Sequence, residues 1–289
     1  MSGLGDLAEL GAIDRIVAAT LAEDLGSGDL TARLTVPAQT RARGQIVAKQ
    51  ALCFCGGPIA ARVFAAVDAE LHVEQHVAEG SAVEPGTVLL GLAGNARALL
   101  AAERSALNLL GRACAVATVT ASYVAAAGPE LRVVDTRKTM PGLRALDRYA
   151  VRMGGGHNHR NDLGSGVLIK ENHIRCAGSA RAAVEAARAH APHGIRVECE
   201  VETLDELREA IAAGADALLL DNMDDATLRE AVAIAGPKGE RRVILEVSGG
   251  ITIERLPRLA TIGLDVVSVG ALTHSAPNVD LSQLFEVGV

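Results

Sequence analysis

The segment GIRVECEVETLDELREAIAAGADALLLDN (194–222) decides the fold. It contains two apolar, strand-like runs, IRVECEV (195–201) and ADALLLD (215–221), joined by a helical stretch of ordinary crossover length. Strands joined by such a crossover pair in parallel, and continuously apolar strands are typical of sheets that helices cover on their faces. The segment therefore predicts one β-α-β unit of an α/β domain.

The same rhythm continues on both sides of this unit. Four further strand-like runs follow residue 130, separated by helical or loop segments: RVVDT (132–136), VLIKE (167–171), RVILEVSGG (242–250) and LDVVSVG (264–270). Repeated β-α-β units predict a parallel sheet that is closed or partly closed into a barrel. An open doubly wound sheet is the alternative, but no G-x-G-x-x-G motif follows the first strand to support it.

The first third of the chain has a different pattern. Apolar positions at helical spacing predict a helix over 8–25, and a long Ala-rich and Leu-rich stretch predicts another over 99–127. Between them, the runs at 44–50, 71–77 and 87–92 predict strands. A chain of 289 residues has room for a barrel and a smaller α+β domain.

Composition excludes several classes of protein. A net charge of −7 and the absence of tryptophan argue against a partner that is nucleic acid or an anionic membrane. The longest uncharged stretch, 113–129, is shorter than the ~20 apolar residues of a membrane span, and no signal peptide is indicated. Five scattered cysteines without zinc-type spacing suit reduced thiols, so we expect a cytoplasmic protein.

Cationic side chains follow the first two strands of the series. The run Asp135-Thr136-Arg137-Lys138 ends the first strand, and Lys170 lies near the end of the second. Between them, a glycine-rich loop carries His157, His159 and Arg160. Guanidinium and ammonium groups at a barrel mouth predict binding of carboxylate or phosphate. We do not expect the two histidines to bind a metal ion, because the neighbouring cations would repel it.

Carboxylates follow the next two strands. Glu198, Glu200 and Glu202 alternate along one strand and therefore share a face, and Asp221 ends the following strand. Such a group suits a divalent cation held together with substrate phosphate, and it also stabilises developing positive charge. The alternative is an internal salt-bridge network with the cations of the neighbouring strands.

Glycines follow the last two strands, in VSGGI (247–251) and VSVGAL (267–272). Backbone N–H groups in such loops approach a phosphate closely, so these loops predict phosphate binding.

Arg104, Asn108 and Arg112 recur every four residues on the long helix and form one polar stripe. This stripe is either a solvated face or a contact with an anionic ligand or a second subunit.

Several motifs together strongly resemble the quinolinate phosphoribosyltransferase family. They are ERSALNLL (103–110), DTRKTMPGLRALDRYAV (135–151), GGGHNHRNDLGSGVLIKENHI (154–174), VECEVET (197–203), LLDN (219–222), VSGGI and VGALTHS (269–275). The resemblance implies an N-terminal α/β sandwich domain, 1–115, on which the tail 275–289 packs, and an incomplete α/β barrel, 116–274. It also implies a homodimer with shared active sites, or a larger assembly of such dimers.

The resemblance assigns roles to individual residues. The site for the pyridine dicarboxylate would comprise Thr136, Arg137, Lys138, His159, Arg160 and Lys170, with Arg104 reaching the neighbouring subunit's site. Catalysis would rest on Lys138, Glu200 and Asp221, the last two near the ribosyl group and a magnesium ion. Phosphate would be bound by Ser248, Gly249, Gly250, Val269, Gly270, Ala271 and His274. Glu171 and the loop 161–166 depart from the family pattern, which bears on fine specificity alone.

The activity implied by the resemblance is transfer of a phosphoribosyl group to quinolinate with loss of carbon dioxide, a step of NAD biosynthesis. Three rival hypotheses remain. A paralogue with the same barrel would act on another base, an aldolase-type barrel would form a Schiff base at Lys170, and a non-enzymatic protein would bind an anion. The carboxylates Glu200 and Asp221 argue against the last, since they would weaken anion binding.

Overall fold

The chain divides into two compact units. The computed structural model describes residues 7–240 and 243–287. The first unit comprises Met1–Ala121, Thr139–Gly155 and Ala271–Val289, and the second comprises Ser122–Lys138 and Gly156–Gly270. The domains expected from the sequence, 1–115 with 275–289 and 116–274, differ in that 116–121, 139–155 and 271–274 belong here to the first unit. Residues 1–6, 241–242 and 288–289 of those expected ranges lie outside the described residues.

Six strands of the second unit form one parallel sheet, as the apolar runs predict. They are β6 (Arg132–Val134), β7 (Val167–Ile169), β8 (Val197–Val201), β9 (Ala217–Asp221), β10 (Ile244–Ser248) and β11 (Val266–Ser268). Their order is β6-β11-β10-β9-β8-β7, so β7 to β11 are neighbours in the sheet in the order in which they follow each other in the chain, and the first strand, β6, pairs with the last, β11. In the described part of the chain β6 and β7 do not pair. The predicted incomplete barrel is therefore confirmed, and the doubly wound alternative is wrong.

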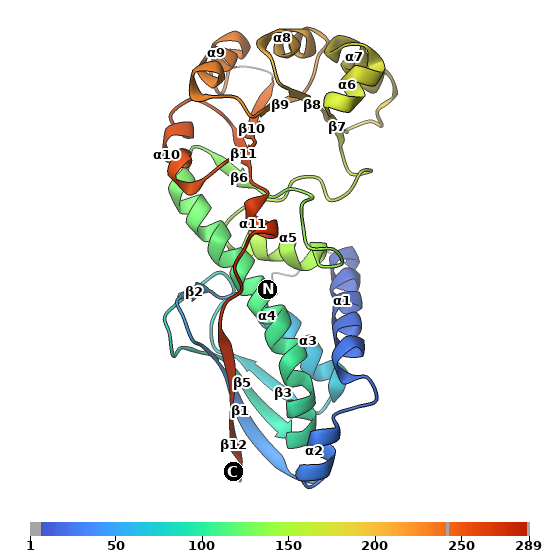
Figure 1. Cartoon of the computed structure of the whole chain (residues 1–289), viewed down its shortest axis with the longest axis vertical. Helices are drawn as coiled ribbons and strands as arrows, with labels where there is room; N and C mark the ends of the chain where they lie inside the picture. The colour runs from blue at the N-terminus through green and yellow to red at the C-terminus, as the bar shows by residue number, and fades with distance from the viewer. Residues whose placement is uncertain (1–6, 241–242, 288–289) are drawn as a thin grey trace. The chain divides into compact units, whose positions relative to one another are not determined.

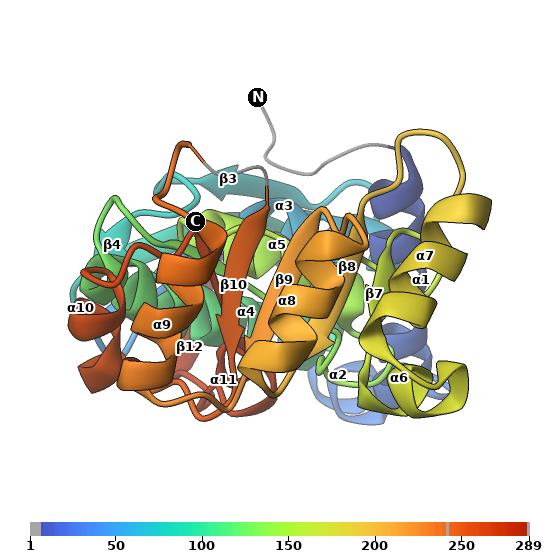
Figure 2. The ribbon, with the colours of Figure 1, turned by 90° about the horizontal axis from the view of Figure 1, so that it is seen from above.

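Helices of the second unit connect these strands. Figure 2 shows α7, α8 and α9 against one side of the sheet. Two of these helices begin with side-chain caps directly after a strand: Thr203 accepts a hydrogen bond from the backbone N–H of Glu206 at 3.2 Å, and Asp224 accepts one from Thr227 at 2.8 Å. The helices are α6 (Glu171–Ala177), α7 (Ala180–His190), α8 (Leu204–Ala212), α9 (Asp225–Ala235), the 3₁₀ turn η1 (Ile253–Arg255) and α10 (Leu256–Leu259).

The first unit contains an antiparallel sheet of order β12-β1-β5-β3 (Figure 1). The strands are β1 (Arg41–Ala48), β3 (His72–Gln75), β5 (Val88–Asn95) and the C-terminal β12 (Leu281–Val287), which pairs with β1 along its whole length. A short pair, β2 (Leu52–Cys53) and β4 (Ala82–Val83), lies apart from this sheet. The helices are α1 (Leu7–Leu25), α2 (Leu30–Thr35), α3 (Gly57–Val67), α4 (Ala96–Ala127), α5 (Arg144–Met153) and α11 (Ala271–His274), with the last turns of α4 in the second unit.

The helices and strands expected in the first third are present as α1, α4, β1, β3 and β5, with ends that differ by a few residues. The sequence did not predict α2, α3 or the short strands β2 and β4. Apart from α3, which has 11 residues, these elements are brief, and periodicity over so few residues does not distinguish a helix or strand from a turn. The pairing of β12 with β1 joins segments more than two hundred residues apart, for example Gly44 with Phe285.

Helix α4 forms the centre of the first unit. It is long and apolar enough to cross a membrane by length and composition alone, but 56% of its most apolar window is buried inside the protein. Leu99 and Ala106 are fully buried, and the amide of Gln283 on β12 donates to the carbonyl of Leu99 at 3.4 Å. The apolar character of α4 is therefore that of a core helix that packs on a sheet.

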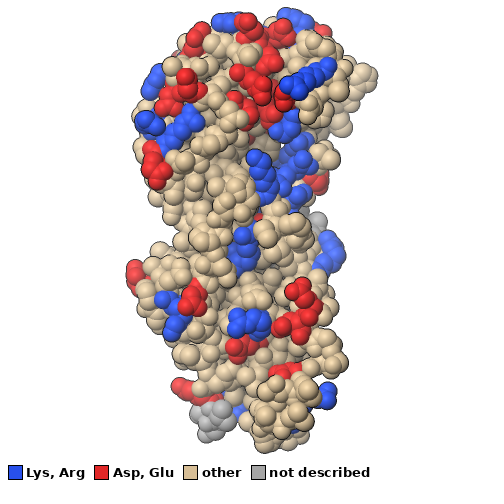
Figure 3. Space-filling view, in the orientation of Figure 1, with Lys and Arg blue, Asp and Glu red and all other residues tan. Residues whose placement is uncertain are grey.

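The surface carries no broad field of one sign on the face seen in Figure 3. Lysine and arginine side chains lie among aspartate and glutamate side chains there, rather than in one continuous positive band. This distribution agrees with the net charge of −7 and offers nucleic acid no electrostatic footprint on that face. Any anion would have to bind at a local cluster of cations.

The polar stripe on α4 has two different parts. Arg104 and Asn108 are exposed, whereas Arg112 pairs with Asp147 of α5 through two hydrogen bonds of 2.8 Å. The Asp147 carboxylate is fully buried, and it also accepts the backbone N–H of Met140 at 3.1 Å. Arg112 therefore secures the chain that follows the first barrel strand, and the solvated-face interpretation does not hold for it.

This buried pair leads to a stability prediction. We expect Asp147→Ala to lower the free energy of unfolding by about 3 kcal/mol, because it leaves the guanidinium of Arg112, which is 15% exposed, without its carboxylate. The matched control is Glu185→Ala, which removes an exposed carboxylate 3.7 Å from Arg181 and should change the free energy by less than ~0.5 kcal/mol. Urea unfolding measures both changes in free energy, and equal changes in the two variants would show that the pair of Arg112 and Asp147 does not stabilise the fold.

Candidate active site

A cavity of about 430 Å³ lies within the second unit, beside the carboxyl ends of the parallel strands. Every one of the six strands contributes to its wall, either through its last residues or through the loop that follows it. Its volume is within the range of clefts that bind small molecules. The predicted site residues that line it are Thr136, Arg137, Lys138, His159, Arg160, Lys170, Glu200, Asp221, Ser248, Gly249 and Gly250.

The remaining predicted residues do not line this cavity. Val269 is buried, and its N–H donates to the carbonyl of Val134 at 3.0 Å, so this amide is already used to join β11 to the end of β6. Gly270 is the last residue of the second unit. Arg104, on α4, and Ala271 and His274, on α11, belong to the first unit. Their roles in the site stay predictions.

Four cationic side chains gather in the cavity: Arg137, Lys138, Arg160 and Lys170. Burial, and then repulsion from Arg137, lower the pKa of Arg160, which shows that two guanidinium groups lie close together in a partly desolvated place. The guanidinium of Arg160 also donates to the carbonyl of Gly166 at 3.0 Å, which fixes its direction. Such a cluster favours an anionic ligand with more than one negative group.

His159 is held in place by the end of the first barrel strand. The fully buried carboxylate of Asp135 accepts the backbone N–H of His159 at 2.7 Å and the side-chain amide of Asn158 at 2.6 Å. Asp135 therefore fixes the loop that carries both His159 and Arg160. The other histidine of the motif, His157, is exposed and joins β6 through backbone hydrogen bonds alone.

Two buried carboxylates lie against the ring of His159. Its Nε2 is 3.3 Å from Glu198 and 3.6 Å from Glu246, which are on β8 and β10. Burial, and then repulsion from Glu198, raise the pKa of Glu246 to about 7. The sequence interpretation missed Glu246, although an acid in the otherwise apolar run VILEV is a signal of a strand that faces a polar barrel interior.

The distances within this trio would also suit a metal ion, since the three ligand atoms lie within 4.8 Å of one another. The hydrogen bonds of His159 argue otherwise. Its Nδ1 accepts the backbone N–H of Arg160 at 2.7 Å, so the ring proton is on Nε2 and points at the carboxylates. A hydrogen bond from Nε2 to Glu198 raises the pKa of His159. Nε2 therefore acts as a donor and not as a metal ligand.

Glu200 and Asp221 are two carboxylates whose oxygen atoms could hold a divalent cation. Glu200 is the next-to-last residue of β8, Asp221 is the last residue of β9, and both line the same cavity. Burial, and then repulsion from Glu200, raise the pKa of Asp221, which shows that the two charges lie near each other. Two hard oxygen donors that repel each other fit a divalent cation. The salt-bridge alternative is realised in part, because the ammonium of Lys170 pairs with Glu200.

The glycine loop after β10 lies directly beside the end of β9. The backbone N–H of Asn222 donates to the carbonyl of Ser248 at 3.1 Å, and a Cβ on Gly249 would lie 2.1 Å from the Asn222 side-chain oxygen. Gly249 has φ of 88°, so both its backbone conformation and its neighbour require glycine. Asn222 lines the cavity, and the sequence analysis gave it no role.

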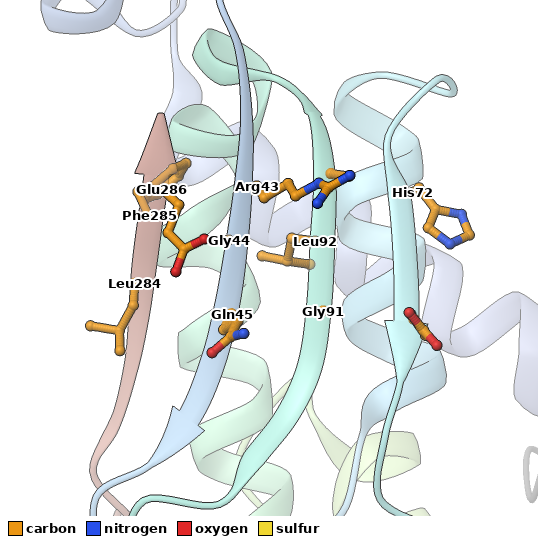
Figure 4. A pocket seen from close by; sticks show the side chains of 11 residues that line it. Arg43, Gly44, Gln45, His72, Gly91, Leu92, Leu284, Phe285 and Glu286 are labelled. Atoms are coloured by element: carbon orange, nitrogen blue, oxygen red, sulfur yellow. The ribbon is translucent and has the colours of Figure 1, made fainter. Parts of the chain in front are cut away.

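A larger cavity, of about 650 Å³, lies in the first unit on the sheet β12-β1-β5-β3 (Figure 4). Arg43 extends from β1 over β5, while the ring of His72 points away from β3 and out of the groove. The wall also includes Gly44, Gly91 and Leu284. This groove gathers neither the cations nor the carboxylates of the second unit's cavity, so it is not the candidate active site.

Comparison with known proteins agrees with this geometry. The family model "Quinolinate phosphoribosyl transferase, C-terminal domain" matches residues 116–283, and the model of the N-terminal domain matches residues 29–114. The chain belongs to the quinolinate phosphoribosyl transferase family. The matched C-terminal region contains every residue that lines the cavity of the second unit.

Individual relatives span nearly the whole chain. A probable carboxylating nicotinate-nucleotide pyrophosphorylase of Bacillus subtilis is 41% identical, over 90% of this chain and 89% of its own. The crystal structure of NadC from Streptococcus pyogenes superimposes with a TM-score of 0.92 at 38% identity, covering 99% of this chain and all of that one. The nicotinate-nucleotide pyrophosphorylase of Francisella tularensis superimposes with a TM-score of 0.88 at 37% identity, covering 96% of each chain.

The buried trio leads to a prediction about pH. The pKa of Glu246 is about 7 in the folded protein, whereas an unfolded glutamate has a pKa of ~4.3. Between these two pH values the folded state binds more protons than the unfolded state, so the free energy of unfolding falls as the pH rises. We expect Glu246→Gln, which carries no charge, to gain stability relative to the wild type by on the order of 2 kcal/mol between about pH 5 and about pH 8.

Thermal unfolding across that pH range measures the difference between variant and wild type. Glu185→Gln, on the exposed surface of α7, is the control and should show a difference that does not change with pH. A pH-independent difference for Glu246→Gln would mean that this carboxyl group titrates normally in the folded protein.

Proposed function

We propose that this protein transfers the phosphoribosyl group of phosphoribosyl diphosphate to quinolinate, with release of diphosphate and carbon dioxide and formation of nicotinate mononucleotide. Members of its family act on small molecules, and the names of its relatives state a carboxylating nicotinate-nucleotide pyrophosphorylase. We further propose that the protein is cytoplasmic, which agrees with its free cysteines.

The observation that carries this proposal is the presence of both charge types in one cavity. Quinolinate has two adjacent carboxylates, and phosphoribosyl diphosphate is heavily anionic, so both substrates need cations close by. Arg137, Lys138, Arg160 and Lys170 line the same cavity as Glu200 and Asp221. The cations balance the negative charge of the substrates, while the carboxylates are suited to a positive charge that develops at the ribosyl carbon.

The quinolinate site would be formed by the cations of the first two strand ends. Thr136, Arg137, His159, Arg160 and Lys170 come from adjacent parts of the cavity wall. A guanidinium group binds a carboxylate through two parallel hydrogen bonds, which would fix the plane of the pyridine ring. His159, held by Asp135, would set the depth to which the ring enters.

The donor would be bound at the opposite end of the strand series. Ser248, Gly249 and Gly250 after β10 would bind its phosphate group, because glycine permits close approach of backbone N–H groups. Glu200 and Asp221 would hold a magnesium ion, which when bound offsets charge on the diphosphate that departs. Lys138 would lie beside this group, since its charge already acts on Asp221.

The chemistry then follows from these placements. The bond between the ribosyl carbon and diphosphate breaks, and Glu200 and Asp221 stabilise the positive charge that develops on the sugar. The pyridine nitrogen attacks that carbon and becomes cationic. The ring then accepts the electron pair of the bond to the adjacent carboxylate, carbon dioxide leaves, and a proton takes its place.

The Schiff-base hypothesis loses support from the geometry. Lys170 would need a free amine to attack a carbonyl group, but its ammonium pairs with Glu200. A paralogue that acts on another base remains the second candidate. The grouping of Arg137, Arg160 and Lys170 favours a base with two carboxylates over a base with one or none.

We predict that the purified protein, given magnesium and phosphoribosyl diphosphate, converts carboxyl-labelled quinolinate to equal amounts of carbon dioxide and nicotinate mononucleotide. Released label and product are measured together by scintillation counting and chromatography. Nicotinate in place of quinolinate is the control and should give no turnover. Turnover of a different base, with quinolinate unused, would establish the paralogue instead.

Lysine at position 138 offers a direct test of the site. We expect Lys138→Ala to reduce turnover by at least ~100-fold, because it removes a cation next to the departing diphosphate. Lys238→Ala is the matched control, since Lys238 pairs with Glu130 at 3.8 Å and does not line the cavity. It should keep wild-type turnover, and equal activity of both variants would remove Lys138 from the mechanism.

We also propose a homodimer whose sites use Arg104 from the neighbouring subunit, in line with the exposure of Arg104 on α4. Arg104→Ala and Lys138→Ala proteins should each be nearly inactive. After subunit exchange at equal amounts, mixed dimers with one intact site in each should restore about one quarter of wild-type activity. Native mass spectrometry verifies the exchange, and mixed dimers without activity would exclude a shared site.

A further inference from the structure

Asn222 has a backbone conformation that side chains rarely adopt. Its φ is 53°, and in the described part of the chain it is the one residue other than glycine with positive φ. Asparagine tolerates this left-handed region better than most residues, but the conformation still costs roughly 1 kcal/mol. Strain of this kind persists where the surrounding structure requires it, and it is common at functional sites.

The side chain of Asn222 contacts the carboxylate that precedes it. Its Nδ2 donates a hydrogen bond of 2.7 Å to Oδ2 of Asp221. The carboxylate can accept but not donate, so the nitrogen of the amide must face Asp221 and the oxygen must face the other way. The left-handed turn brings the amide back over Asp221, which the extended backbone of a strand would not do.

The other side of Asn222 contacts the glycine loop. Its backbone N–H donates to the carbonyl of Ser248 at 3.1 Å. A Cβ on Gly249 would lie 2.1 Å from Oδ1 and 3.0 Å from the backbone nitrogen of Asn222. Gly249 therefore packs flat against Asn222, and the ends of β9 and β10 are joined through this one residue.

We propose that Asn222 is a positioning residue that sets the direction of the Asp221 carboxylate relative to the glycine loop. The proposal rests on the proposed function, in which Asp221 acts beside the ribosyl group and Ser248 and Gly249 bind its phosphate. A hydrogen bond to Oδ2 stops rotation of the carboxylate and leaves Oδ1 as the oxygen for the ribosyl group and its metal ion. The same residue then determines the spacing between the two parts of the donor site.

Three variants separate this role from that of a simple turn. Asn222→Gly relieves the backbone strain and removes the amide, Asn222→Ala removes the amide and keeps the strain, and Asn222→Asp replaces the donor by a second carboxylate. If Asn222 served the turn alone, Asn222→Gly would be as active as the wild type. If Asn222 is a positioning residue, kcat should fall at least ~10-fold in each of the three variants.

Two readouts distinguish positioning from general damage. The KM for quinolinate should change less than about 2-fold in Asn222→Gly, because the cations of its site lie on other strands, and thermal stability should equal or exceed that of the wild type. Crystal structures of the wild type and of Asn222→Gly should show the Asp221 carboxylate rotated in the variant. Asn158→Ala, which loses a different side-chain amide that donates to a carboxylate, that of Asp135, is a control for loss of an amide as such. It should raise KM for quinolinate more than it lowers kcat.

Full kcat in Asn222→Gly, or an Asp221 carboxylate that keeps its direction in the crystal, would overturn the proposal. Failure of the proposed function is a separate outcome. It would appear as a wild type that does not turn over quinolinate, and the crystal structures would still decide whether Asn222 directs Asp221.

Discussion

The parallel pairing of six strands is the constraint on which the site depends. Because all six strands run in the same direction, their carboxyl ends meet at one edge, and residues far apart in sequence line one cavity. Lys138 and Asp221 are separated by more than eighty residues, but the charge of one acts on the carboxyl group of the other. An antiparallel arrangement would have divided these residues between two edges.

The interior of the second unit is more polar than its strands suggest. Glu198 and Glu246 enter the barrel from buried strands, and one imidazole lies between them. The two carboxylates repel each other, so one of them holds a proton near neutral pH, and His159 is fixed by donation from Nε2. Two members of the trio, His159 and Glu246, are themselves part of the cavity wall, and Asp135 holds the loop that carries His159. Rigid support of this kind is what a site for two charged substrates requires.

Much of this arrangement could be predicted from the residues alone. Six apolar runs at crossover spacing predicted the barrel, and the charged residues that follow them predicted which edge bears the cavity. Glu246 was missed because a single acid inside an apolar run indicates a polar neighbour in the interior but does not identify it. The stripe on α4 was ambiguous for a similar reason. Spacing places Arg104 and Arg112 on one face, but it does not show that Asp147 pairs with Arg112 and not with Arg104. The role of Asn222 depends on a backbone angle, which residue type makes possible but does not specify.

The sequence by itself determined the fold class and the charged residues of the site, because apolar periodicity and the residues after each strand are local properties of the chain. It also carried the family motifs, which the comparisons confirmed. The tertiary structure alone decided which residues meet: Lys170 with Glu200, His159 with Glu198 and Glu246, and Asn222 with Gly249. These contacts join different strands and loops, so they depend on register, twist and side-chain direction across the sheet. Register, twist and side-chain direction are set by the packing of the whole sheet, so they cannot be read from the two residues that a contact joins.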